Sequence, residues 1–252
     1  MTQGIELLAL DGIPEVSPGD DLAALICAAA AAQGIGLTDD DVVVVTQKIV
    51  SKAEGRVVDL ATVDPSAFAR QVGERWGKDP RQIELVLRES TDLVRMGPGG
   101  LIISRTRHGF VCANAGVDLS NVGGADSATL LPVDPDTSAL ELRDGVRRIS
   151  GAAPAVILSD SFGRPWRNGI VDVALGAAGL EVLIDLRGQP DADGREMHST
   201  VIAVADELAS AADLAAGKTS HCPVVVIRGY RYAPGAGRAA ALVMDAERDL
   251  FR

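Results

Sequence analysis

The segment with the most concentrated set of reactive side chains is residues 159–169, SDSFGRPWRNG. It follows a short apolar run, and polar residues at the end of a strand commonly form sites. Asp160 can hold a metal ion, and the hydroxyl of Ser161 can complete its coordination. Arg164 and Arg167 can clamp a phosphate or a carboxylate through paired hydrogen bonds. The alternative is a strand-to-turn junction whose arginines form surface ion pairs.

A second candidate lies in the glycine-containing loop at residues 114–122, where Asp118 and Asn121 are three positions apart. Hard cations such as Mg²⁺ prefer oxygen ligands, and a loop can turn a carboxylate and an amide toward one ion. The same spacing also suits an Asx-type turn with no ligand.

Two further polar groups have both a functional and a structural interpretation. Asp206 and Glu207 lie in a helical segment, where adjacent side chains diverge by about 100°, so one of them at most faces a given site. A solvated acidic face explains them equally well. Residues 46–52, TQKIVSK, follow a buried strand, and a turn there can present Lys52 to a polyphosphate. The alternative is that the two lysines of this segment are solvated and bind no ligand.

Hydrophobic periodicity and turn residues indicate the elements that must position these groups. Strands are expected at residues 5–10, 41–46, 155–158 and 224–228, and an antiparallel meander at 92–114. Helices are expected at residues 21–33, 64–76, 80–90, 137–149, 200–217 and 244–251. Because the elements do not alternate steadily, we expect an α+β fold with mixed and antiparallel sheets and flanking helices. We expect residues 1–252 to form one unit, either undivided or built from two interwoven subdomains.

Composition excludes several classes of protein. The chain has 252 residues, a formal net charge of −11 and 47% hydrophobic residues. Such a charge argues against a nucleic-acid-binding surface, which needs clustered Lys and Arg. The N-terminus lacks a basic, apolar leader, no segment suits a membrane anchor, and Cys27, Cys112 and Cys222 have no CxxC spacing. We therefore expect a cytoplasmic protein without a zinc site or a disulfide framework.

Common motifs for phosphate binding and hydrolysis are missing from the sequence. There is no GxxxxGK[ST] loop and no GxGxxG after a strand, so a nucleotide would have to bind by another geometry. There is also no GxSxG elbow and no HExxH pair. The carboxylates, hydroxyls and basic side chains described above remain as the candidates.

Five blocks in order resemble the coenzyme F420-0:L-glutamate ligase family. They are DGIPE at residues 11–15, VVVTQKIVSKAEGR at 43–56, AGVDLSN at 115–121, SDSFGRPWRNG at 159–169 and AVADELASAA at 203–212. The match extends from near the N-terminus to about residue 230, and five blocks in register are far more specific than any one of them.

The resemblance implies a GTP-dependent enzyme that joins L-glutamate to F420-0, with Mg²⁺ or Mn²⁺ and K⁺ as helpers, acting as a homodimer. It leaves open whether the enzyme also extends a poly-γ-glutamate tail. It implies metal ligation by Asp118, Asp160 and Ser161, although many members have Thr at the last position. The resemblance also implies a GTP site lined by Ile13, Pro14, Glu15, Val16, Gln47, Lys52 and Asn121. At the position of Gln47 some relatives have Ser.

Further implications concern the carboxylates at residues 206–207 and the end of the chain. Asp206 and Glu207 are implied as additional metal or nucleotide contacts. Some relatives carry a flavin reductase domain after the ligase, and we expect this chain, which ends at Arg252, to lack that activity.

The expected chemistry is attack by the substrate carboxylate on the γ-phosphoryl group, followed by displacement of phosphate from the acyl phosphate by the amine of glutamate. Such a reaction depends on positioning and charge neutralisation, for which Arg164 and Arg167 are candidates. Two alternatives remain: a ligase that acts on another carboxylate-bearing cofactor, and a GTP-binding regulator without ligase activity.

Overall fold

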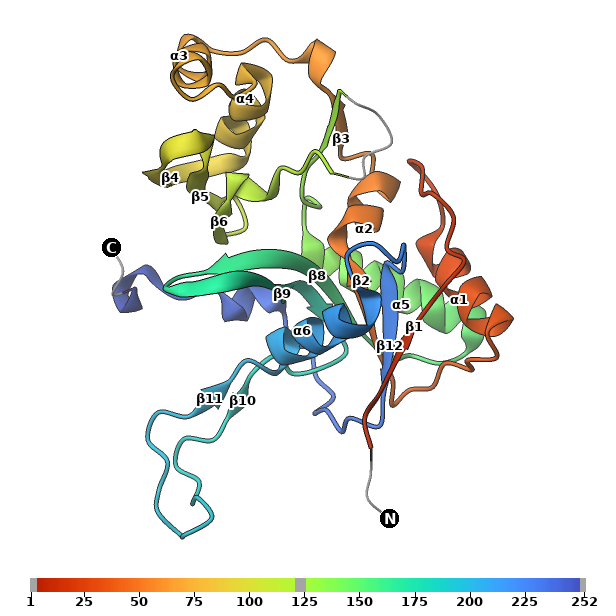
Figure 1. Cartoon of the computed structure of the whole chain (residues 1–252). Helices are drawn as coiled ribbons and strands as arrows, with labels where there is room; N and C mark the ends of the chain where they lie inside the picture. The colour runs from red at the N-terminus through yellow and green to blue at the C-terminus, as the bar shows by residue number, and fades with distance from the viewer. Residues whose placement is uncertain (1–3, 121–125, 250–252) are drawn as a thin grey trace.

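A five-stranded mixed sheet forms the centre of the protein (Figure 1). The computed structural model describes residues 4–120 and 126–249. In spatial order the strands are β1 (Glu6–Ala9), β12 (Val224–Arg228), β2 (Val42–Thr46), β8 (Ala155–Arg164) and β9 (Arg167–Ala178). Strands β2 and β8 run parallel, and every other neighbouring pair is antiparallel. Together with the flanking helices, this sheet confirms the expected α+β fold.

The valine run of β2 is explained by burial on both faces of the sheet. Val43 and Val45 belong to one core with helices α1 (Leu22–Ala32) and α5 (Pro135–Ser150). Val42 and Val44 belong to a second core with helix α6 (Val204–Ala216) on the other face. A strand covered on both faces has no polar face, and the sequence therefore shows no alternation there.

A third core lies in the segment between β2 and α5. Helices α3 (Ala67–Trp76) and α4 (Pro80–Glu89) pack with an antiparallel sheet of β4 (Ser90–Met96), β5 (Ile102–Thr106) and β6 (Val111–Ala113). This sheet confirms the meander predicted over residues 92–114. Helix α4 begins as the sequence predicts, because Asp79 accepts a 2.8 Å hydrogen bond from the backbone N–H of Arg81 and Pro80 occupies the first turn.

Two small ladders complete the described sheets. Strand β3 (Val57–Asp59) pairs with β7 (Ser127–Thr129) and connects the third core to the central sheet. Strands β10 (Ile184–Asp185) and β11 (Val201–Ile202) pair at the base of an arm that extends away from the body of the protein (Figure 1). No helix in the described part of the chain has the length and apolar character needed to cross a bilayer.

The structure differs from the sequence prediction around the candidate site. Strand β8 does not end at residue 158 but continues to Arg164, and it forms a long antiparallel ribbon with β9, a strand that was not predicted. The segment after β2 is not a turn but helix α2 (Gln47–Ala53), because Ile49 and Val50 bury their side chains in the first core. Helix α2 and strand β8 therefore provide two regular elements at the candidate site, where the sequence predicts a turn and a strand end.

The helix predicted at residues 244–251 is wrong for the described residues there. The chain forms only short 3₁₀ turns, at Ala239–Leu242 and Ala246–Arg248. The sequence from Asp245 to Asp249 has four charged residues out of five and little apolar surface to bury. A short helix without such packing is marginal in water.

Candidate functional site

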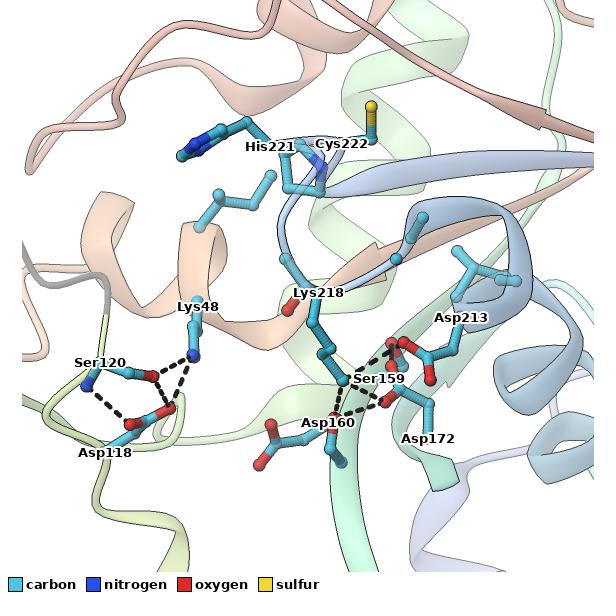
Figure 2. Close-up of a pocket in the computed structure, with 18 of the residues that line it drawn as sticks. Lys48, Asp118, Ser120, Ser159, Asp160, Asp172, Asp213, Lys218, His221 and Cys222 are labelled. Carbon is cyan, nitrogen blue, oxygen red and sulfur yellow. Dashed lines mark hydrogen bonds and ion pairs between the residues drawn. The ribbon is translucent and has the colours of Figure 1, made fainter. Parts of the chain in front are cut away.

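A cavity of about 980 Å³ opens between the central sheet and the loops around it. Its wall comes from the N-terminal loop at residues 13–16, helix α2, the loop that contains Asp118, strand β8, and the segment at 217–223 before β12. Figure 2 shows its polar side chains in two groups, one around Asp118 and one around Asp172. This volume is at the upper end of the range typical of small-molecule sites.

The first group joins helix α2 to the loop after β6. The ammonium of Lys48 lies 2.6 Å from Oδ2 of Asp118 and donates a 2.9 Å hydrogen bond to Oγ of Ser120 (Figure 2). The backbone N–H of Ser120 donates to Oδ1 of Asp118 at 2.7 Å. Burial opposes ionisation of Asp118, but the bonds from Lys48 and Ser120 outweigh it, and the pKa of this carboxyl lies below its usual value.

Asp160 has the opposite electrostatic setting. The pKa of this carboxyl is raised to about 7, chiefly by burial and also by the negative charges of Asp172 and Asp118, while the backbone N–H of Ser161 and the charge of Lys48 lower it in part. Asp118 and Asp160 line the same cavity, although they are 42 positions apart in the chain. A divalent cation would relieve their mutual repulsion.

The second group is organised by Asp172 on β9. Its Oδ2 accepts a 2.9 Å hydrogen bond from Ser159, and its Oδ1 accepts a 2.6 Å hydrogen bond from Ser161. The ammonium of Lys218 lies 3.3 Å from Oδ1 of Asp172 and 3.2 Å from Asp213, and it also donates to Oγ of Ser161 (Figure 2).

The N-terminal loop contributes a further ion pair at the cavity wall. Lys52 of α2 lies 2.5 Å from Oε1 of Glu15. The lysine is nearly buried, whereas the carboxylate of Glu15 is largely exposed. The pair therefore holds one positive charge at the cavity while its acidic partner faces solvent.

The described residues that line the cavity carry more negative than positive side chains. Among the described lining residues, five carboxylates (Glu15, Asp118, Asp160, Asp172 and Asp213) outnumber three lysines (Lys48, Lys52 and Lys218). No three or more His, Cys, Asp and Glu side chains in residues 4–120 and 126–249 form a preassembled metal cage. Mg²⁺ is typically bound by one or two carboxylates together with substrate phosphates and waters. The all-oxygen set of Asp118, Asp160 and Ser161 fits that pattern.

Comparison with known proteins identifies the family. A family model for F420-0:Gamma-glutamyl ligase matches residues 12–229. The chain is 45% identical over 252 residues to the coenzyme F420:L-glutamate ligase of Methanothermobacter thermautotrophicus, covering 99% of both chains. It is 44% identical over 257 residues to the Methanopyrus kandleri protein of the same name, again covering 99% of both. This chain belongs to the F420-0:gamma-glutamyl ligase family.

Membership of the ligase family confirms the resemblance of the five sequence blocks, and the structure brings much of the expected site together. Eight of the expected residues line the cavity: Ile13, Pro14, Glu15, Val16, Lys52, Asp118, Asp160 and Ser161. Their roles toward metal and nucleotide stay predictions. Asn121 lies outside the described residues.

Three residues expected to contact a ligand lie away from the surface of the cavity. Gln47 is buried, and its Oε1 accepts a 2.7 Å hydrogen bond from the hydroxyl of Ser51. Asp206 accepts a 2.9 Å hydrogen bond from the backbone N–H of Ala174, at a register shift in the β8–β9 ladder. Glu207 is exposed on α6. None of the three lines the cavity, so the proposed contacts lack support from this geometry.

The two arginines proposed as a clamp lie at the far end of the β8–β9 ribbon. Arg164 donates a 3.0 Å hydrogen bond to the backbone carbonyl of Asn168 across the turn, and Arg167 is exposed. Neither lines the cavity. The sequence suggested otherwise because the strand was expected to end at residue 158, which would have put the arginines close to Asp160.

Sequence reasoning missed Asp172, Asp213 and Lys218. Asp172 would have been found by predicting a second strand in residues 167–178, because an antiparallel ribbon pairs it directly with Ser161. Asp213 lies in the last turn of α6 and Lys218 lies just beyond the helix, where no local pattern distinguishes them from solvated residues.

Proposed function

We propose that this chain is a GTP-dependent ligase that joins L-glutamate to coenzyme F420-0. The observation that carries the proposal is the cavity in which Asp118 and Asp160 lie together with Lys48 and Lys52. Its size suits a nucleoside triphosphate beside a second substrate, and the names of the relatives supply F420 and L-glutamate as the substrate classes.

Each group at the cavity has a defined task in this proposal. Asp118, Asp160 and Ser161 hold Mg²⁺ or Mn²⁺, which supplies positive charge against the phosphate oxygens. Lys52, at the wall of α2, binds the triphosphate as a point charge. Lys48 is paired with Asp118 and is within reach of the same anion.

The proposed reaction has two steps. A carboxylate oxygen of F420-0 attacks the γ-phosphorus of GTP, the bond to the β,γ-bridging oxygen breaks, and GDP leaves. The amine of glutamate then attacks the carbonyl carbon of the acyl phosphate, the C–O bond to phosphate breaks, and the amine proton is released. No side-chain nucleophile is required, because positioning and charge neutralisation supply the catalysis.

The decisive experiment is mass spectrometry of products from purified protein, GTP, Mn²⁺, L-glutamate and F420-0. Formation of glutamylated F420 together with GDP supports the proposal. A product only with another carboxylate-bearing acceptor would assign a different ligase, and GTP binding without glutamate-dependent phosphate release would indicate a regulator. The number of added residues follows from the product masses.

Asp160→Ala is the sharpest test of the site. We expect it to abolish product formation while the protein stays folded by circular dichroism, because the carboxylate is needed for the cation rather than for packing. Asp193→Ala, which removes an exposed carboxylate on the arm, is the matched control. Turnover like that of the wild type in Asp160→Ala at ordinary Mn²⁺ concentrations would refute the role.

A homodimer and stimulation by K⁺ complete the proposal. Adding KCl in place of NaCl to the same assay tests the second of these. A rate that is indifferent to the monovalent cation would remove K⁺ from the scheme.

A further inference from the structure

Asp172 occupies a position that the proposed reaction does not use directly. It is 8% exposed and lies opposite Ser161 in the β8–β9 ladder, so the two side chains share one face of the ribbon. Its carboxylate accepts hydrogen bonds from the hydroxyls of Ser159 and Ser161 and from the ammonium of Lys218 (Figure 2). All three donors come from residues that line the cavity.

These contacts fix the orientation of the Ser161 hydroxyl. A serine hydroxyl has one proton to donate and two lone pairs to offer. The proton of Ser161 is directed at Oδ1 of Asp172 over 2.6 Å, and one lone pair accepts from Lys218. The remaining lone pair is the only one left for a cation, and its direction is set by the other two bonds.

We propose that Asp172 is a positioning residue, which orients the hydroxyl of Ser161 so that this oxygen presents a lone pair to the divalent cation. This inference rests on the proposed function, because it assumes that Ser161 is a metal ligand. Groups that orient metal ligands typically change metal affinity 10- to 100-fold when they are removed.

Groups other than the carboxylate of Asp172 hold this part of the ribbon in place. Its backbone carbonyl is held independently by a 2.7 Å hydrogen bond from Ser210 on α6. The ladder between β8 and β9 is made by main-chain groups. Removing the carboxylate therefore leaves the ribbon attached, and removing the Ser210 hydroxyl perturbs the attachment without touching the carboxylate.

The test is a double-mutant cycle on Mn²⁺ affinity, measured by electron paramagnetic resonance of free Mn²⁺ with GDP present and without glutamate or F420-0. We expect Asp172→Ala and Ser161→Ala each to weaken Mn²⁺ binding about tenfold or more. The loss in the double variant should be much smaller than the sum of the two single losses, because Asp172 acts chiefly through that hydroxyl. Asp172→Asn, which keeps an acceptor oxygen, should recover part of the affinity.

Ser210→Ala is the matched control and should stay within about twofold of the wild type. If Asp172→Ala does not fold, Asp172→Leu removes the same acceptors at similar length and enters the same cycle. Additive losses in the double variant, or affinity like that of the wild type in Asp172→Ala, would overturn the proposal. So would a wild-type protein that binds no Mn²⁺. Mn²⁺ binding with the expected coupling but no glutamylated product would instead refute the ligase and leave the role of Asp172 standing.

Discussion

Replacing Asp160 with asparagine should stabilise the metal-free protein at neutral and alkaline pH. The folded chain raises the pKa of this carboxyl from 3.8 to about 7, chiefly through burial and then through the charges of Asp172 and Asp118. An ionised Asp160 is therefore destabilising wherever no cation compensates it. Asparagine keeps the shape of the side chain and removes the charge.

The sign and size of the effect follow from the two pKa values. Well below pH 4 the carboxyl is protonated in both the folded and the unfolded state, so its ionisation costs the wild type no stability there. As pH rises toward 7, the unfolded chain releases the proton first, so the free energy of unfolding of the wild type falls, and the loss is complete above 7. At 1.36 kcal/mol per pKa unit, the loss is roughly 4 kcal/mol, and solvent reaching the cavity reduces it toward about 2 kcal/mol.

The assay is urea unfolding followed by circular dichroism, from pH 4.5 to pH 8.5, with a chelator and without nucleotide. The stability of Asp160→Asn relative to the wild type should grow with pH and level off above 7. Asp193→Asn, an exposed carboxylate on the arm, should show no such trend. A stability difference between Asp160→Asn and the wild type that does not change with pH would refute the reasoning, as would a variant that is less stable than the wild type at pH 8.

Three other outcomes are expected. Lys52→Met should weaken GTP binding about tenfold in calorimetry, since a charge-assisted contact is lost, and an unchanged dissociation constant would remove Lys52 from the nucleotide site. Ile83 is fully buried in the third core, and Ile83→Ala should lower the free energy of unfolding, measured in urea, by about 2–5 kcal/mol. A loss below about 1 kcal/mol would mean that neighbouring side chains fill the cavity left by the substitution. Light scattering after size exclusion should give twice the 26.1 kDa chain mass, and the monomer mass would contradict the expected homodimer.

Elements whose signal is local were predictable from the sequence. The valine run of β2, the proline at the start of α4 and the β-branched residues of the meander are each recognisable within a short stretch of sequence. The β8–β9 ribbon was only half predicted, because the glycines and alanines of β9 have low strand propensity. What makes that segment a strand is its pairing with β8, and pairing between segments is not visible in either one alone.

The site divides in the same way. Residues of the resembling blocks, among them Asp118, Asp160 and Lys52, meet at the cavity as expected. The hydrogen bonds from Ser159 and Ser161 to Asp172 depend on register across the ribbon, and the contact of Lys218 depends on how the end of α6 meets it. The prediction for Arg164 and Arg167 lacks support from the structure because it depends on the length of β8, which sets how far the two arginines lie from the carboxylates.

Strand β12 sits between β1 and β2, although it is made more than two hundred residues after β1 begins. During synthesis, the edges of β1 and β2 that pair with β12 stay unpaired until almost the whole chain has left the ribosome. The segment just before β12 also brings Lys218 and His221 to the cavity, so the wall of the cavity is incomplete until that strand is inserted. Pairing of β1 with β12 is a contact between distant parts of the chain, and contacts of this kind slow folding and leave unpaired strand edges open to aggregation in the meantime.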